Sequence, residues 1–170
     1  MQKTKHAVQT VALSAVFAAL IFCATVFLKI PILTGYIHLG DSMIFLAASI
    51  LPPGYASVAA AAGAAIADVA GGFALWAPFT LVIKAAMALF IRSAGDKILT
   101  KRNVVMVFAA SALNVVGYYF TEVILYGNWI APFMSAAWNL LQFAGGVIVY
   151  LLLGAALDRI RVKRLLDPER

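Results

Sequence analysis

The chain has 170 residues, of which 64% are hydrophobic, and it carries a formal net charge of +6. Soluble domains are roughly 45–50% apolar, so a soluble domain of this length would leave a large apolar surface in water. The composition therefore predicts an integral membrane protein in a lipid bilayer. The single cysteine, Cys23, excludes a disulfide framework and a thiolate metal site. The basic residues cluster at the ends of apolar segments, which indicates membrane topology rather than nucleic-acid binding.

Six apolar segments follow one another along the chain. A membrane-spanning helix needs about 20 apolar residues, and only the second segment is clearly shorter. Pro31 ends the first segment, and Pro78 and Pro132 lie in first turns, where proline is tolerated. The first segment is too long for the apolar core of a signal peptide, so no cleavable signal is expected. We expect one all-α membrane domain over residues 1–170, a bundle of six transmembrane helices at approximately 8–30, 40–52, 54–71, 77–94, 104–125 and 132–157.

The distribution of charge predicts the orientation of the bundle. The segments 1–7, 92–103 and 158–170 hold eleven of the thirteen lysine and arginine residues. The loops on the other side, at 31–39, 72–76 and 126–131, hold none. Because cytoplasmic loops are enriched in basic residues, both termini are predicted to be cytoplasmic.

The stretch from Gly35 to Ala48 brings polar residues between two apolar segments. Tyr36, His38 and Asp41 either form a solute-facing surface at the outer side of the membrane or belong to an ordinary turn between helices. Asp41 stands where a carboxylate favours the start of a helix. We therefore interpret Asp41 as a helix cap, and Tyr36 and His38 as candidates for touching a solute.

Several polar side chains are expected at membrane depth, where an ionised group is costly unless it has a partner. Asp68 and Lys84 lie near the outer ends of consecutive helices and are predicted to form a structural ion pair, with direct contact to a solute as the alternative.

Two polar stripes run along the last two helices. Asn114, Tyr118 and Glu122 recur every four residues and share one face, and Ser135, Asn139 and Gln142 also share a face. These stripes either bond the two helices to each other or line a binding cavity, and we favour the cavity because aromatic loops lie above it. The amides offer paired donors and acceptors for the edge of a heterocycle. The candidate ligand-binding residues are Tyr36, His38, Trp76, Asn114, Tyr118, Glu122, Trp129, Asn139 and Gln142.

Small residues mark one face of the first helix. Ala15 and Ala19 are four residues apart and would let another helix approach closely. The pattern leaves open whether that helix belongs to the same chain or to a second protein.

The sequence lacks the signatures of several classes of enzyme. It has no G-x4-G-K-[ST] loop, so the chain is not expected to hydrolyse ATP itself, and it has no H-E-x-x-H or G-x-S-x-G. With two histidines and one cysteine, neither a metal nor a cofactor is expected. Six helices are few for a stand-alone alternating-access carrier. A solitary proton-coupled carrier, with Asp68 or Glu122 titrating, and a non-transport membrane scaffold remain as alternatives.

Three motifs carry a resemblance to a known family. They are G-Y-I-H-L-G-D at 35–41, A-x-A-D at 65–68 followed by Gly71-Gly72, and W-A-P-x-T-L-x-I-K at 76–84. Together they resemble the substrate-binding S components of energy-coupling factor (ECF) transporters, in the branch that includes riboflavin, hydroxymethylpyrimidine and queuosine-type carriers. The resemblance covers residues 8–157.

The resemblance implies a six-helix bundle of a prokaryotic plasma membrane that binds a vitamin or its precursor near the outer surface. Gly35 to His38 would then belong to a lid, and Ala15 and Ala19 would dock on a transmembrane T subunit. Two cytosolic ATPase subunits would supply the energy for import. The Y-I-H-L-G-D form favours a queuosine-type 7-deazapurine as the ligand, with riboflavin or a pyrimidine precursor as alternatives.

Overall fold

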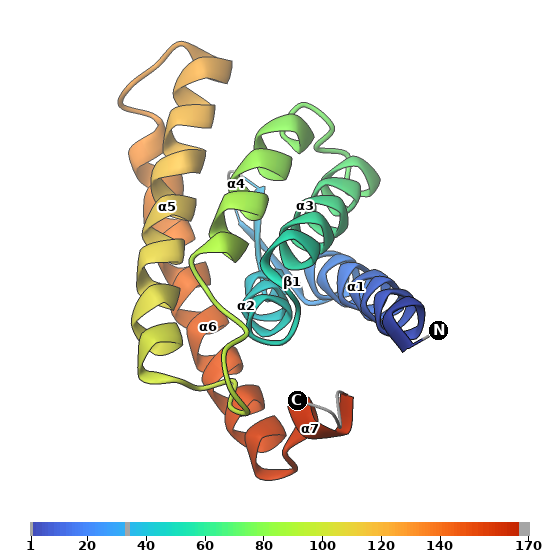
Figure 1. The fold of residues 1–170 in the computed structure, drawn as a ribbon. Helices are drawn as coiled ribbons and strands as arrows, with labels where there is room; N and C mark the ends of the chain where they lie inside the picture. Colours follow the sequence, from blue (N-terminus) through green and yellow to red (C-terminus); the bar gives the residue numbers. More distant parts are fainter. Residues whose placement is uncertain (1, 33–34, 167–170) are drawn as a thin grey trace.

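The structure is a computed structural model that describes residues 2–32 and 35–166. Within these residues the chain forms seven helices and one two-stranded antiparallel sheet, arranged as a bundle with the sheet at one end (Figure 1). The elements are α1 Gln2–Val26, β1 Lys29–Ile32, β2 Gly35–His38, α2 Gly40–Ile50, α3 Pro53–Ala70, α4 Ala77–Leu89, α5 Lys101–Tyr126, α6 Pro132–Arg159 and α7 Val162–Leu166.

Helix α2 lies at the centre of the bundle. Ile44, Phe45 and Ala47 are at most 1% exposed, and α2 packs against α1, α3, α4 and α6. Its buried residues lie on all sides of the helix and include polar ones such as Asp41 and Ser49, so α2 is enclosed by its neighbours. The core of the protein is built around this short helix.

Helices α1 and α3 approach each other closely at Gly63. A Cβ atom at this position would come within 2.5 Å of the Ala18 carbonyl oxygen, so only glycine permits the contact. On the same side of α1, Phe17 and Ile21 are buried in the core. The face of α1 that packs within the chain is therefore set by these residues and not by Ala15 and Ala19, which are both exposed.

The first helix ends earlier than the apolar pattern predicts. Helix α1 stops at Val26, and Lys29–Ile32 pairs as a strand with Gly35–His38. Proline disfavours helical backbone in the residue before it, so Pro31 keeps Ile30 extended. The predicted helix over 8–30 is thus shorter at this end, and a β-hairpin stands where a plain loop was expected.

The fourth helix also ends earlier than predicted, at Leu89 instead of residue 94. The side chain of Asn103 explains the difference because its amide donates to the carbonyls of Arg92 and Ile98. Its oxygen accepts from the Arg92 backbone N–H. These bonds satisfy backbone groups of the irregular segment between α4 and α5, and Thr100 then caps α5 by accepting from the Asn103 N–H.

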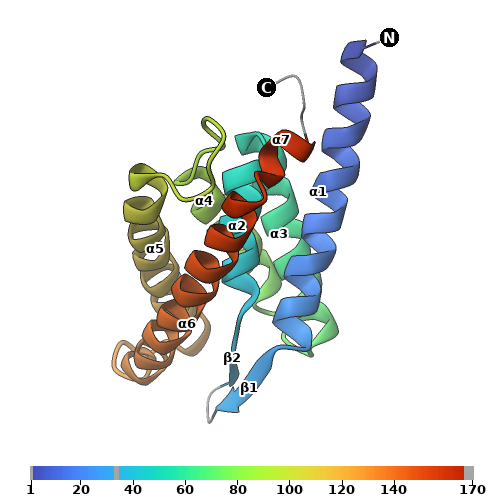
Figure 2. The same cartoon turned by 90° about the horizontal axis from the view of Figure 1, so that it is seen from below.

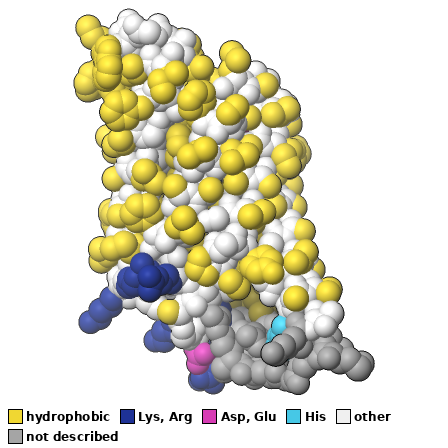
Figure 3. Space-filling model, turned by 45° about the horizontal axis from the view of Figure 1, so that its top comes forward, with side chains coloured by type: hydrophobic (Ala, Val, Ile, Leu, Met, Phe, Trp, Pro, Cys, Tyr) yellow, Lys and Arg dark blue, Asp and Glu magenta, His cyan; other side chains and the backbone are white. Residues whose placement is uncertain are grey.

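Three helices are long and apolar enough to cross a membrane, namely α1 from His6, α5 and α6. The start of α1 and the helix α7 lie at one end of the bundle, here called the termini end, and the β-hairpin lies at the opposite hairpin end (Figure 2). Lysine and arginine side chains gather at one end of the face shown in Figure 3, and apolar side chains are spread over the remainder of the bundle on that face. Six spanning helices with cytoplasmic termini remain a prediction.

Candidate functional site

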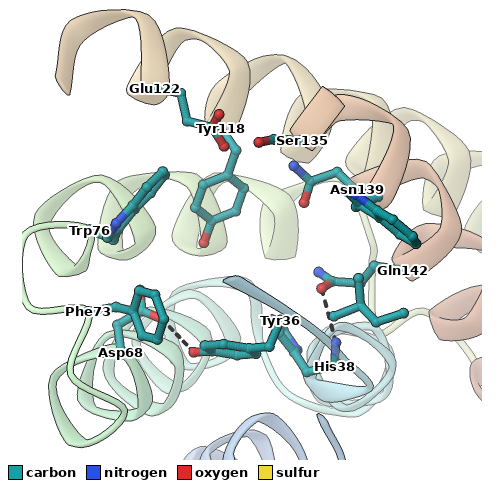
Figure 4. A pocket seen from close by; sticks show the side chains of 12 residues that line it. Tyr36, His38, Asp68, Phe73, Trp76, Tyr118, Glu122, Ser135, Asn139 and Gln142 are labelled. Carbon is teal, nitrogen blue, oxygen red and sulfur yellow. Dashed lines mark hydrogen bonds between the residues drawn. The ribbon is translucent and has the colours of Figure 1, made fainter. Parts of the chain in front are cut away.

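A cavity of about 100 Å³ lies at the hairpin end of the bundle (Figure 4). A single water needs roughly 10–15 Å³ by the same kind of measure, so the cavity has room for a small planar molecule. Its walls come from β2, the end of α3, the α3–α4 loop, α5 and α6. The lining residues are Tyr36, Ile37, His38, Asp68, Phe73, Trp76, Tyr118, Glu122, Ser135, Trp138, Asn139 and Gln142.

Tyr36, Phe73 and Asp68 form one wall. The rings of Tyr36 and Phe73 meet edge to face with centroids 5.1 Å apart. The Tyr36 hydroxyl donates to Asp68 Oδ1 over 3.3 Å. Burial raises the pKa of Tyr36 and the Asp68 carboxylate raises it further, so the hydroxyl keeps its proton and acts as a donor.

Trp76 and Tyr118 form the opposite wall, across the cavity from Tyr36 and Phe73 in Figure 4. Their ring centroids are 6.3 Å apart. The Tyr118 hydroxyl shares a hydrogen bond of 2.8 Å with Thr80 of α4, which holds the ring in place. Aromatic walls on two sides suit a flat ligand, since ring pairs pack in stacked or edge-to-face arrangements.

Helices α5 and α6 add polar groups to the remaining wall. Glu122, Ser135 and Asn139 all line the cavity, and the Asn139 amide faces the space between the aromatic walls (Figure 4). Gln142 lies deeper, and its oxygen accepts from the His38 backbone N–H at 3.1 Å. Five of the six residues in the two predicted stripes thus line one cavity, and its role in binding a ligand stays a prediction.

Below the cavity lies a buried network around Lys84, which is 1% exposed. Its ammonium donates to the Asp41 carboxylate, with which it forms a salt bridge, and to Asn114 Oδ1 at 2.7 Å. The second Asp41 oxygen accepts from Gln142 Nε2 at 2.9 Å. Each charge in this network therefore has a partner of opposite charge or an amide.

The network corrects three sequence predictions. The predicted ion pair between Asp68 and Lys84 does not form, because Asp41 from α2 lies closer to the ammonium. Asp41 lies in the first turn of α2, but its carboxylate binds Lys84 and Gln142 and does not cap the helix. Asn114 binds Lys84 and does not line the cavity. Sequence spacing placed these residues at similar depths, but it could not show which helices are neighbours.

His38 links the hairpin to this network. Its Nδ1 accepts from the Gly40 N–H at 3.1 Å. Burial lowers the pKa of His38 to about 4, an effect that Lys84 strengthens and Asp41 opposes. The imidazole is therefore neutral at pH 7, and its unprotonated Nδ1 holds the start of α2 against β2.

Trp129, a predicted ligand-binding residue, does not line the cavity. Its side chain is 62% exposed in the α5–α6 turn, where its ring packs against Phe120 and its carbonyl accepts from the Tyr119 hydroxyl. Sequence reasoning in turn left Phe73 and Trp138 off the list of ligand-binding residues. Phe73 lies in the same loop as the predicted Trp76, and Trp138 precedes the predicted Asn139. Their closeness in sequence to these residues could have identified them.

A second hollow is an apolar groove between α1 and α3 on the surface of the bundle. Ala15 and Ala18 line it on α1, and Gly54, Val58 and Ala62 line it on α3. Small side chains make it shallow enough for another helix to approach.

Within the described residues, no three histidine, cysteine, aspartate or glutamate side chains gather closely enough to hold a metal ion.

The fold and the cavity define a membrane protein that can hold a small solute inside a bundle of helices. The chain matches the family model described as "ECF-type riboflavin transporter, S component" over residues 5–159 and belongs to that family. It is therefore the substrate-binding subunit of an ECF importer and not itself an enzyme. No curated protein matches the chain.

Proposed function

We propose that this chain captures a planar nitrogen heterocycle in the cavity at the hairpin end, from the outer side of the plasma membrane. One observation supports this proposal most directly. The same cavity is lined by aromatic rings on two sides and by the polar groups of Glu122 and Asn139 between them. A flat ring would lie between Tyr36 or Phe73 and Trp76 or Tyr118. Its edge would then meet the carboxylate and the amide.

Among the ligands of this branch, a queuosine-type 7-deazapurine fits these groups best. Its guanine-like edge presents a ring N–H and an exocyclic amino group side by side. Glu122 can accept from both donors, and the Asn139 amide can both donate and accept. Riboflavin offers one ring N–H between two carbonyls, and a hydroxymethylpyrimidine offers one amino group, so each uses fewer acceptors of the cavity. Riboflavin remains compatible with the family match.

The ligand is tested by titrating the purified protein with queuine, riboflavin and 4-amino-5-hydroxymethyl-2-methylpyrimidine. Trp76 and Trp138 line the cavity, so binding should quench tryptophan fluorescence, and it should raise the melting temperature because the ligand binds only the folded state. We expect queuine to bind most tightly. Failure of all three compounds to change either signal would refute the proposal.

For import, we propose that the groove between α1 and α3 docks on the T subunit, which works with two cytosolic ATPase subunits. The exposed Ala15 and Ala19 support this assignment because both side chains are accessible to a partner. Ala15→Trp and Ala19→Trp should abolish co-purification with the T subunit and leave ligand titrations unchanged. A matched control is Val105→Trp, at an exposed position of α5. Undisturbed co-purification of both alanine variants would show that the subunit docks elsewhere.

A further inference from the structure

Asp68 carries a buried oxygen that has no hydrogen-bond partner in the part of the chain that the structure describes. The residue lies in the last turn of α3 and lines the cavity. Its Oδ1 accepts from the Tyr36 hydroxyl, whereas its Oδ2 is buried and has no hydrogen-bond partner among the described residues. A buried acceptor without a donor is unfavourable. Because Asp68 lines the cavity, a small shift of its carboxylate would let this oxygen accept from a donor that enters there.

No cation of the described structure neutralises this carboxylate by direct contact. Lys84 is committed to Asp41 and Asn114. Lys29 lies on the exposed surface, with its ammonium 4.9 Å from the centre of the Tyr36 ring. Neither lysine forms a salt bridge with Asp68 within the described residues.

The charged side chains that line the cavity are all acidic. Its described lining residues include two carboxylates, Asp68 and Glu122, and no lysine or arginine. The ion pair of Lys84 with Asp41 beneath it is neutral as a unit. In a low-dielectric site like charges repel strongly, so a phosphate group on the ligand would be opposed. An N–H donor or a positive charge would be attracted.

The orientation of Asp68 fits such a donor. In Figure 4 the carboxylate stands beside the Phe73 and Tyr36 rings, on the wall opposite Trp76 and Tyr118. A planar ligand packed along these rings would present its edge to Asp68. Hydrogen bonds from N–H to a carboxylate are stronger than bonds between neutral groups.

We propose that Asp68 is a specificity-determining residue of this importer. It accepts an N–H of the ligand and, together with Glu122, restricts the cavity to uncharged or cationic heterocycles without a phosphate group. This inference rests on the proposed function, since it assumes that the cavity binds a nitrogen heterocycle.

The test compares each parent compound with its phosphate ester. Queuosine and queuosine 5′-phosphate, and riboflavin and flavin mononucleotide, are titrated against the wild-type protein by tryptophan fluorescence. For whichever parent binds, we expect the phosphate ester to bind at least about tenfold more weakly because of charge repulsion. Equal affinities within a pair would overturn the inference without touching the proposed function. Binding of neither queuosine nor riboflavin would overturn the inference, and it would overturn the proposed function as well only if queuine and the pyrimidine also failed to bind.

The Asp68→Asn variant then assigns the effect to one residue. It keeps the shape of the side chain and removes its charge. We expect the parent compound to bind about tenfold more weakly, because a charge-assisted hydrogen bond becomes a neutral one. The ratio between the affinities of the parent and its phosphate ester should also become smaller. Asp96→Asn, an exposed carboxylate of the α4–α5 segment, is the control and should bind both compounds like the wild type. Unchanged parent affinity in Asp68→Asn would overturn the inference. If this variant does not fold, equal binding of the two members of a pair to the wild type still overturns it.

Discussion

Two groups of polar side chains lie next to each other in the bundle, and they differ in how fully the protein satisfies them. In the network around Lys84, each charged atom meets a partner from another helix. In the adjoining cavity, Asp68 keeps an oxygen without a hydrogen-bond partner among the described residues, and aromatic walls leave open space. Gln142 touches both groups, since it binds Asp41 and also lines the cavity. The difference suggests a division of roles in which the first group stabilises the fold and the second is reserved for a ligand.

The largest effect is expected from breaking the network at its cation. Lys84→Met would leave the Asp41 carboxylate buried with Gln142 as its remaining partner. Removal of one member of a buried ion pair typically costs about 3–5 kcal/mol, so the melting temperature of the detergent-purified protein should fall sharply. The double variant Asp41→Asn/Lys84→Met should regain much of this loss because it leaves no unpaired charge. A Lys84→Met protein that melts like the exposed-site control Lys29→Met would contradict the structural role.

A matched pair of asparagines tests the division of roles directly. Asn139 lines the cavity, whereas Asn114 binds Lys84. Asn139→Ala should weaken ligand binding by about 1–3 kcal/mol, the scale of a lost buried partner, and leave the melting temperature of the ligand-free protein almost unchanged. Asn114→Ala should lower that melting temperature and change the ligand affinity less. Titration and thermal unfolding of both variants measure the two effects, and the reverse pattern would refute the division.

The pH dependence of stability tests the link between hairpin and network. The pKa of His38 is lowered to about 4 in the folded protein, whereas an unfolded histidine has a pKa of about 6.5. Between these values the unfolded state binds more protons, so the stability that His38 contributes is complete above about pH 6.5. It is lost as the pH falls toward 4. We expect a loss of about 1–2 kcal/mol over this range, less than the full shift implies, because His38 as a whole residue is only partly buried.

His38→Asn separates this contribution from those of the acidic residues. The asparagine oxygen can accept from the Gly40 N–H as Nδ1 does, but it does not titrate. Melting temperatures measured between pH 4 and pH 7 should therefore fall less steeply for this variant than for the wild type. Parallel curves would show that His38 is not the titrating group.

The sequence predicted the parts of the fold that depend on composition and periodicity. Apolar runs and proline positions indicated the helices, and the four-residue spacing on α5 and the shared face on α6 brought Tyr118, Glu122 and Asn139 toward one cavity. The hairpin was missed because Phe27, Leu28 and Ile30 continue the apolar pattern of α1 without a change of character. The partner of Lys84 was missed for a different reason. Two carboxylates lie at a suitable depth on different helices, and only the packing of α2 at the centre decides between them.

The smallest effect is expected at Trp129, which tests where the cavity ends. Its side chain is largely exposed and lies outside the lining, so Trp129→Phe should change the ligand affinity less than about twofold, within the range of ordinary surface substitutions. Trp76→Phe is the comparison, because it changes a ring that lines the cavity and packs against Tyr118. It should weaken binding and remove part of the fluorescence quenching, whereas Trp129→Phe should remove only background emission. If Trp129→Phe weakened binding as much as Trp76→Phe, the ligand would have to extend beyond the cavity to the α5–α6 turn. The cavity-lining residues would then be only part of the binding site.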